Sequence, residues 1–294
     1  MYRFAPSESS AQAARRLLTS ELDAALEWLG GRDRALDLRV HEARKHLKRV
    51  RALLDLARFV IAPEALREQA RAAQAAAATL SALRGRAALL ICFDALLERT
   101  PDLLDADAVQ RVRATLSPEA EATIDSEAPL TEARGILMRA RADAHELELS
   151  TELNGWEAWS PGFQGTYREA RRAHLHASNY PTARHLHAFR TAEKRHLYQV
   201  ELLEPIWEGP LRSLRQELSE LGDLLGDHHD LSLLWRELER SAELEAERAA
   251  LRAPVEQRLE RFGRAALTLG GRAFAEKPGA IARRFGEYFR SAFD

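Results

Sequence analysis

The sequence predicts an all-α protein, most simply two helical bundles related by an internal repeat. Apolar residues recur every three or four positions over most of the chain, the spacing of a helix with one buried face. No run alternates Val, Ile and Thr as a strand does, and β-branched residues are scarce. A basic helical pattern near residue 41 returns near residue 187, which indicates duplication of a domain rather than a solenoid repeat.

Composition sets the size and the electrostatic background. The chain has 294 residues, enough for one large core or for two domains of roughly 150 residues. Its formal net charge is −2, so local basic clusters stand out against a balanced background. The single cysteine, Cys92, lies in an apolar run and predicts a packed thiol in a reducing compartment.

The sequence also predicts the cellular compartment. Residues 1–4 are followed by Pro, Ser and Glu and carry no apolar signal core. No uninterrupted apolar stretch approaches the length that spans a membrane. We therefore expect a cytoplasmic protein that has no membrane partner.

Helical periodicity and turn residues divide the first half of the chain. Gly30-Gly31 ends the first helix, and Pro63 stops the second, which carries the basic pattern. The Ala- and Leu-rich stretch that follows predicts one long helix or two, with Gly85 as the interruption. The expected helices of this half cover residues 10–29, 35–60, 64–98, 105–115 and 131–149.

A change in composition indicates the boundary between the halves. Residues 154–162 concentrate turn residues and break the helical period. We therefore expect a first bundle over residues 1–152, a linker over 153–164 and a second bundle over 165–294. The expected helices of the second half cover residues 165–177, 183–203, 211–225, 230–251 and 280–293, with a loop from Gly270-Gly271 to Pro278-Gly279.

Two basic helices give the strongest functional signal. One arc of the first helix, roughly 100° wide, collects His41, Arg44, Lys45 and Lys48. Its opposite side carries Val40, Ala43, Leu47, Val50 and Leu54. The differences 187−41, 190−44, 194−48 and 195−49 all equal 146, which places a second basic column at His187, Arg190, Lys194 and Arg195. This recurrence favours a two-fold anion site.

The basic columns indicate the kind of anion. Acidic partners are sparse on these faces, whereas a solubilising surface usually mixes the signs. The column from His41 to Lys48 spans roughly 10 Å of helix axis, longer than a single phosphate needs. Base-stacking aromatic residues are nearly absent apart from Tyr198. The faces therefore suit a bare phosphate chain better than a nucleic acid.

A third basic cluster lies on the predicted helix 165–177. Arg168, Arg171 and Arg172 stand beside Tyr167 and span about one helical turn. At least two of these arginines can share a face. The cluster either joins the groove or forms a charged surface, and the pattern favours neither.

Residues 224–230, Leu-Leu-Gly-Asp-His-His-Asp, raise the question of a metal site. Adjacent His and Asp occur in metal-dependent phosphohydrolases, where further ligands come from distant helices. His41 and His187 are poor candidates for these ligands because each lies among cations. The sequence also has no Gly-rich phosphate loop, paired-Cys zinc spacing or Gly-x-Ser-x-Gly. We expect no metal, no cofactor and no enzymatic activity.

A structural role for the same segment is the preferred interpretation. Gly226 would break a helix, and Asp227 or Asp230 would cap the next helix or pair with an arginine. His228 and His229 are then placed to extend the basic groove.

These motifs resemble those of a known family. Residues 40–54 resemble the first signature helix of the CHAD domain, the conserved histidine α-helical domain. Residues 167–172 and 186–198 resemble its second half, and residues 225–231 are similar to its Leu-Gly-x-x-x-Asp motif. The resemblance covers roughly residues 10–290.

The resemblance implies two four-helix bundles with pseudo-two-fold symmetry around a basic central cavity that binds inorganic polyphosphate. It also implies association with cytoplasmic polyphosphate granules and with granule-associated proteins. Some members carry a triphosphate-processing CYTH domain, which is not expected here because no strands are predicted. The implied polyphosphate-binding residues are His41, Arg44, Lys45, Lys48, Arg49, Arg168, Arg171, Arg172, His187, Arg190, Lys194 and Arg195, to which we add His229.

Two places depart from the family pattern. The first-half counterpart of the Leu-Gly-x-x-x-Asp motif, residues 80–85, has Ser in place of Gly and Gly in place of Asp. This half is expected to be looser or to orient Arg84 differently. In the second basic helix two polar residues replace apolar ones of the first, Glu193 for Leu47 and His196 for Val50.

We therefore expect a non-catalytic polyphosphate-binding protein whose affinity falls with salt and rises as the pH drops toward about 6. Three alternatives stay open. The first is a nucleic-acid-binding protein. The second is a metal-dependent phosphohydrolase that uses His228, His229 and Asp230. The third is a helical scaffold whose basic faces bind acidic proteins.

Overall fold

The computed structural model describes residues 2–5, 8–31, 33–81, 83, 85–116 and 127–293. Across these residues the chain is helical, and its only β-structure is the isolated bridge between Ile61 and Leu149. The all-α prediction is confirmed. The helices are α1 (Ser10–Gly30), α2 (Leu36–Leu56), α3 (Pro63–Ser81), α4 (Gly85–Leu97), α5 (Ala106–Leu116), α6 (Glu127–His145), α7 (Gly155–Asn179), α8 (Ala183–Leu203), α9 (Glu208–Arg240), α10 (Glu245–Ala273) and α11 (Pro278–Phe293).

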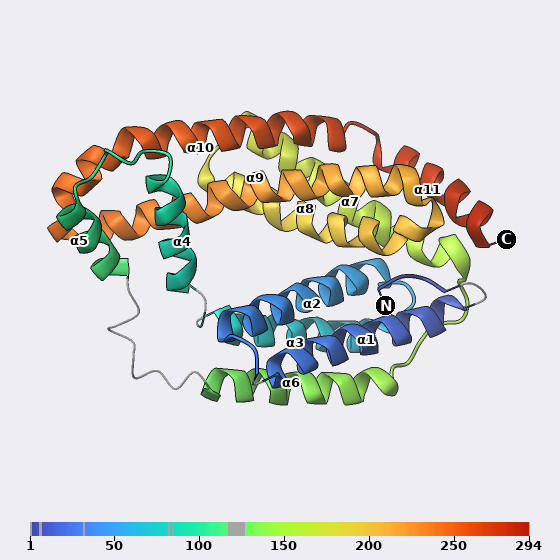
Figure 1. Ribbon diagram of the computed structural model, residues 1–294. Coiled ribbons are helices and arrows are strands. Elements are labelled where there is room, and N and C mark those ends of the chain that lie inside the picture. The colour runs from blue at the N-terminus through green and yellow to red at the C-terminus, as the bar shows by residue number, and fades with distance from the viewer. Residues whose placement is uncertain are drawn as a thin grey trace.

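Two groups of four helices form the body of the molecule (Figure 1). Helices α1, α2, α3 and α6 pack around one another in the lower group, and α7, α8, α9 and α10 do so in the upper group. Helix α2 contacts both α7 and α8, so it forms the seam between the groups, while α11 packs on α7. The basic helices α2 and α8 therefore meet at the middle of the protein.

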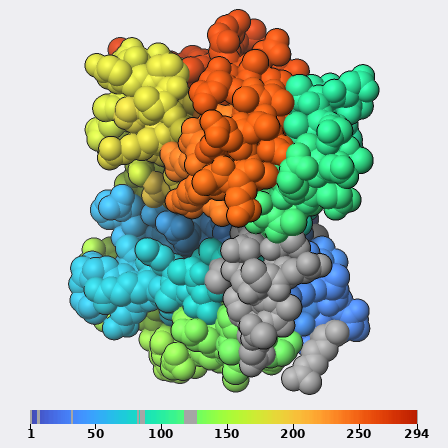
Figure 2. Space-filling model, turned by 90° about the vertical axis from the view of Figure 1, so that its left-hand side faces the viewer, coloured from blue at the N-terminus to red at the C-terminus, as the bar shows by residue number. Residues whose placement is uncertain are grey.

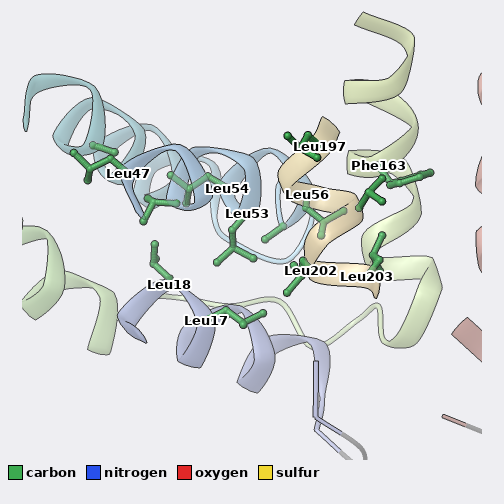
Figure 3. Packing of buried hydrophobic residues seen from close by; sticks show 14 of the residues in the cluster. Leu17, Leu18, Leu47, Leu53, Leu54, Leu56, Phe163, Leu197, Leu202 and Leu203 are labelled. Atoms are coloured by element: carbon green, nitrogen blue, oxygen red, sulfur yellow. The ribbon is translucent and has the colours of Figure 1, made fainter. Parts of the chain in front are cut away.

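One apolar core runs through both groups. Leucines of α1 and α2 pack in the same cluster as Phe163 of α7 and Leu197, Leu202 and Leu203 of α8 (Figure 3). The predicted apolar side of α2 is buried at all five positions, Val40, Ala43, Leu47, Val50 and Leu54. The basic side of α2 consequently faces away from this core.

Helices α4 and α5 leave the first group. Phe93 and Leu96 of α4 are buried in a second apolar cluster with Leu231 and Leu234 of α9, and α5 and α10 complete this cluster. The green α4 and α5 accordingly lie beside α9 and α10 in Figure 1. Residues 1–152 were expected to form the first bundle, but the apolar residues of this segment are buried against the second half.

The predicted linker is helical. Gly155, at a φ of 57°, starts α7, which continues through the whole of residues 155–164. Trp159 and Phe163 are buried there, and a Cβ added at Gly162 would lie 2.2 Å from the carbonyl oxygen of Leu56. The prediction of a linker is wrong because these glycine and aromatic residues provide close packing of α7 on α2 rather than a turn.

The helix ends predicted at glycines in the second half are also wrong. Helix α9 runs without a break through Gly222 and Gly226, and α10 runs through Gly270. A Cβ at Gly270 would lie 2.7 Å from the ring of Phe189, so this glycine allows α10 to approach α8. Helices that pack this closely select glycine for its small size, and the sequence signal for a turn is then misleading.

No helix within the described part of the chain is both long enough and apolar enough to cross a membrane.

Candidate anion-binding site

A cavity of about 240 Å³ lies between α2 and α8. Six arginine and lysine side chains and one histidine line it, three of them from α2 and four from α8. The complete lining is Arg44, Lys48, Arg51, His187, Arg190, Thr191, Lys194, Arg195 and Tyr198. Two segments separated by almost half the chain thus bring their basic columns to one place. Figure 2 views the molecule from the side of α4 and shows the α9–α10 segment above the α2–α3 segment.

Buried polar contacts fix α2 against α8. The Gln199 amide donates to the Ala52 carbonyl oxygen at 3.1 Å, and the same side chain is bonded by the Thr166 hydroxyl of α7. All three of these groups are buried, so breaking either bond would leave an unsatisfied polar atom inside the protein. The relative position of the two basic columns is therefore rigidly set.

Arg44 is held by the last turn of α3. Its guanidinium donates to the Ala77 carbonyl oxygen at 2.9 Å and to the Ser81 hydroxyl. A cation at a helix C-terminus also interacts favourably with the helix dipole. Ser81 is the residue that departs from the family's glycine, so this substitution gives Arg44 a hydrogen-bond partner. Ala82 and Arg84 lie outside the described residues, and the expectation about Arg84 stays a prediction.

The side chains of Arg190 and Lys194 pack against two glycines of α9. A Cβ at Gly226 would lie 3.7 Å from the Arg190 guanidinium, and one at Gly222 would lie 2.2 Å from the Lys194 ammonium nitrogen. The Lys194 ammonium also lies 3.9 Å from a carboxylate oxygen of Asp223. Gly222 therefore makes room for a cavity cation. Gly226 lies inside α9 instead of breaking the helix, which corrects the expected role of this motif.

His187 and His229 form a stacked pair beside the cavity. Their ring centroids are 4.3 Å apart and their planes differ by 28°. Burial lowers the pKa of both imidazoles, to about 4 for His229, and the nearby Arg190 and Arg236 lower them further. Both rings are thus neutral near pH 7 and act there as hydrogen-bonding groups. Any gain in positive charge from them therefore comes below the ordinary imidazole pKa of 6.5.

Arg51 lines the cavity and was not predicted. It lies three residues after Lys48 and seven after Arg44, so it shares their face of α2. Extending the basic column by one more turn would have found it. No counterpart exists on α8, where Leu197 follows Lys194 by the same three residues.

Two predicted arginines form ion pairs. Arg195 lines the cavity and pairs with Asp55 of α2 at 3.3 Å and with Glu169 of α7. Arg49 does not line the cavity; it pairs with Glu201 of α8 and lies 3.9 Å from a carboxylate oxygen of Glu21. Both arginines join helices of the two groups, and Arg49 serves the interface rather than the cavity.

The remaining predicted residues lie outside the lining of this cavity. Lys45 approaches Glu42 at 3.4 Å, and the exposed His41 lies 3.8 Å from the same carboxylate. On α7, Arg171 donates to the Phe274 carbonyl oxygen at 3.2 Å and Arg168 to the Gln164 side chain at 3.2 Å. Arg172 is exposed on the same helix. The structure does not bring the α7 arginines into this cavity.

The metal alternative requires His and Asp side chains from different helices to lie close together. Among the described residues, no three His, Cys, Asp or Glu side chains are arranged to hold a metal ion. His228 is buried, and its ring faces Gly263 of α10.

Asp230 lines a separate pocket with the half-buried Cys92, and burial raises the pKa of the Cys92 thiol to about 12. The thiol is thus protonated and partly accessible rather than fully packed.

The fold and the cavity define a class: an all-α protein of two four-helix groups, with a cavity lined by cations between one helix of each group. The chain belongs to the CHAD domain family, which its sequence matches over residues 16–239. It is similar to the crystal structure of the CHAD domain from the plant Ricinus communis, with a TM-score of 0.60. The two are 18% identical, and the match covers 97% of this chain and 94% of that one, so the likeness establishes the fold. No curated protein matches the sequence.

Proposed function

We propose that this protein binds inorganic polyphosphate, without transforming it, in the cavity between α2 and α8. The observation that carries the proposal is the convergence of six Arg and Lys side chains on one small cavity in a chain of net charge −2. Placing like charges together is unfavourable in the free protein and becomes favourable when a polyanion neutralises them.

The shape and lining of the cavity favour a bare phosphate chain over a nucleic acid. Tyr198 is the only aromatic side chain of the lining other than His187, and it is 9% exposed, which leaves little surface for a base to stack on. A cavity of about 240 Å³ suits successive phosphates better than nucleotides with their bases. Arginine binds phosphate oxygens in a two-pronged fork, and lysine supplies a mobile charge.

The cations are partly preorganised for such a ligand. Arg44 is fixed by α3, and Arg195 is fixed by carboxylates of α2 and α7. A ligand then orders fewer side chains on binding, which improves affinity. By family resemblance, the proposal extends to a cytoplasmic location on polyphosphate granules and to contact with granule-associated proteins.

Charge reversal at the cavity tests the proposal. We expect Lys48→Glu combined with Lys194→Glu to abolish binding of long-chain polyphosphate in calorimetric titrations, while the helical circular-dichroism signal survives. The matched control is Lys277→Glu combined with Arg240→Glu, because both residues are exposed, lie outside the cavity and change the charge equally. Equal loss of binding in both double variants would contradict the cavity as the binding site.

The same assay separates the alternatives. Single-stranded DNA at equal phosphate content should fail to displace polyphosphate, and displacement would favour the nucleic-acid alternative. Phosphate release with Mg²⁺ or Mn²⁺ that is lost in His229→Ala would favour the phosphohydrolase alternative. Indifference to every polyanion tested would favour the scaffold alternative.

A further inference from the structure

Glu193 is a buried acid that has no role in the polyphosphate binding proposed above. Its side chain is completely buried on α8, next to Lys194 of the cavity lining. Neither carboxyl oxygen has a hydrogen-bond partner within the described structure. A buried charge without partners is strongly unfavourable, so a carboxyl group in this place is expected to hold its proton.

Glu193 and Lys194 converge on the same glycine of α9. A Cβ at Gly222 would lie 3.0 Å from a carboxyl oxygen of Glu193 and 2.2 Å from the Lys194 ammonium nitrogen. The carboxyl group therefore lies directly behind one of the cations that the ligand would contact. A negative charge at this point would act on Lys194 through a protein interior of low polarity, where charge interactions are strong.

The other charged and titratable groups around Glu193 come from three helices. Arg190 and Tyr198 flank it on α8, Asp223 approaches from α9, and Lys48 of α2 lines the same cavity. Where α8 packs on α7, the buried His196 has its pKa lowered to about 3 by burial and stays neutral. Burial raises the pKa of Glu193 to about 8, against the opposing effect of Lys194 and Arg190.

We propose that Glu193 regulates the anion site by its protonation: the neutral acid leaves Lys194 available to the ligand, and the ionised acid neutralises Lys194 and weakens binding. This inference rests on the proposed function. Because a bound polyanion disfavours a second negative charge nearby, binding must also favour the protonated form. Polyphosphate binding near pH 8 is therefore accompanied by proton uptake at Glu193.

The size of the effect follows from linkage. If the bound polyanion raises the pKa of Glu193 by about one further unit, affinity for the ionised protein is about tenfold weaker. Most of this loss, about fivefold, should occur between about pH 7 and pH 9, above the range in which His187 and His229 titrate. The two sources of pH dependence are thus separated.

Titrations of long-chain polyphosphate at pH 6.5, 7, 8 and 9 test this inference, with wild type, Glu193→Gln and Glu193→Asp. We expect the wild-type Kd to rise about fivefold between pH 7 and pH 9, the Gln variant to show a flat profile, and Asp to retain the pH dependence. Glu217→Gln is the matched control, since Glu217 is exposed on α9 and lies outside the cavity. Titration in buffers of different ionisation enthalpy should show proton uptake in the wild type and less in Glu193→Gln.

A second measurement does not depend on a variant. The ¹³C signal of the Glu193 carboxyl group in the wild type should titrate near pH 8 and shift to higher pH with polyphosphate. A midpoint below pH 6, or equal pH profiles in wild type and Glu193→Gln, would overturn the inference while leaving polyphosphate binding intact. Absence of wild-type binding at pH 6.5 would contradict the proposed function itself, and this inference with it.

Discussion

The two walls of the cavity carry the same basic pattern on different supports. On the first wall, Arg44 of α2 is bonded to the last turn of α3, including Ser81. On the second wall, Arg190 of α8 lies over Gly226 of α9, and its buried Nε has no partner in the described structure. One cation is anchored by hydrogen bonds, whereas the other packs against α9 with its Nε unbonded. The packing partner, more than the basic pattern, decides how each cation is held.

The walls also differ on their buried sides. Where α2 buries Leu47 and Val50, α8 buries Glu193 and His196. At these two positions the first wall is apolar, whereas the second wall has two titratable groups within the protein. Two helices with the same basic pattern can thus differ in electrostatic behaviour because of the residues behind that pattern.

Making the second wall resemble the first should have the largest effect on stability. In the folded chain burial raises the pKa of Glu193 from its ordinary value of 4.5 to about 8. Between these values the folded chain keeps a proton that the unfolded chain releases, so the free energy of unfolding falls as the pH rises. Glu193→Leu should therefore be more stable than wild type at pH 9 by on the order of 3–5 kcal/mol.

Urea unfolding at pH 5, 7 and 9 measures this difference. The reciprocal variant Leu47→Glu serves as the control and should lose stability at neutral pH, because it buries a new acid in the first wall. A gain from Glu193→Leu that is the same at pH 5 and pH 9 would show that Glu193 is already ionised in the folded protein.

Removing one arginine from each wall should separate binding from stability. Arg44→Ala and Arg190→Ala should each weaken polyphosphate binding by about 1.5–3 kcal/mol, the value of a hydrogen bond to a charged group. Arg44→Ala should also lower the melting temperature because its bonds to α3 are lost. Arg190→Ala should change stability less. Equal thermal effects in the two variants would contradict the difference between the walls.

Exchanging the residues beneath these arginines should have a smaller effect. Gly226→Ser gives α9 the residue that α3 has, and a Cβ there meets Arg190 at an ordinary contact distance of 3.7 Å. We expect a gain in unfolding free energy of about 0.5 kcal/mol from helix propensity alone. Ser81→Ala should lose about 1 kcal/mol through its bond to Arg44. Chemical denaturation measures both, and a loss of stability in Gly226→Ser would show that the second wall needs its glycine.

The histidine pair should give the smallest effect. Burial lowers the pKa of His187 and His229, so both are neutral near pH 7. A bound polyanion favours their protonated forms, and affinity should therefore rise as the pH falls from about 6 to 5. His229→Gln should remove part of this rise and leave the Kd at pH 7 within about twofold. If the whole rise in affinity occurred between pH 7 and pH 6 instead, the two imidazole rings would be less buried than the structure indicates.

The sequence predicted the cavity better than its surroundings. Helical phase and the 146-residue offset identified Arg44, Lys48, Arg190 and Lys194, because these properties depend only on position along a helix. Phase alone could not show that Arg49 pairs with Glu201, since that contact depends on how two distant helices pack.

Glycine and apolar residues account for the errors in the fold. Gly162 and Gly270 carry the sequence signal of a turn, yet both lie inside helices at places of close approach. Phe93 and Leu96 predicted a buried face of α4 without indicating which half would cover it. Local periodicity predicts that a residue is buried, but only the tertiary contacts show which helix it packs against.

A crystal structure with a short polyphosphate tests the central claim most directly. We predict continuous density for the phosphate chain between α2 and α8, with phosphate oxygens bonded to Arg44 and Lys48 on one side and to Arg190 and Lys194 on the other. Density on an outer surface, such as the groove beside Arg261 and Arg264 of α10, together with an empty central cavity, would contradict the account.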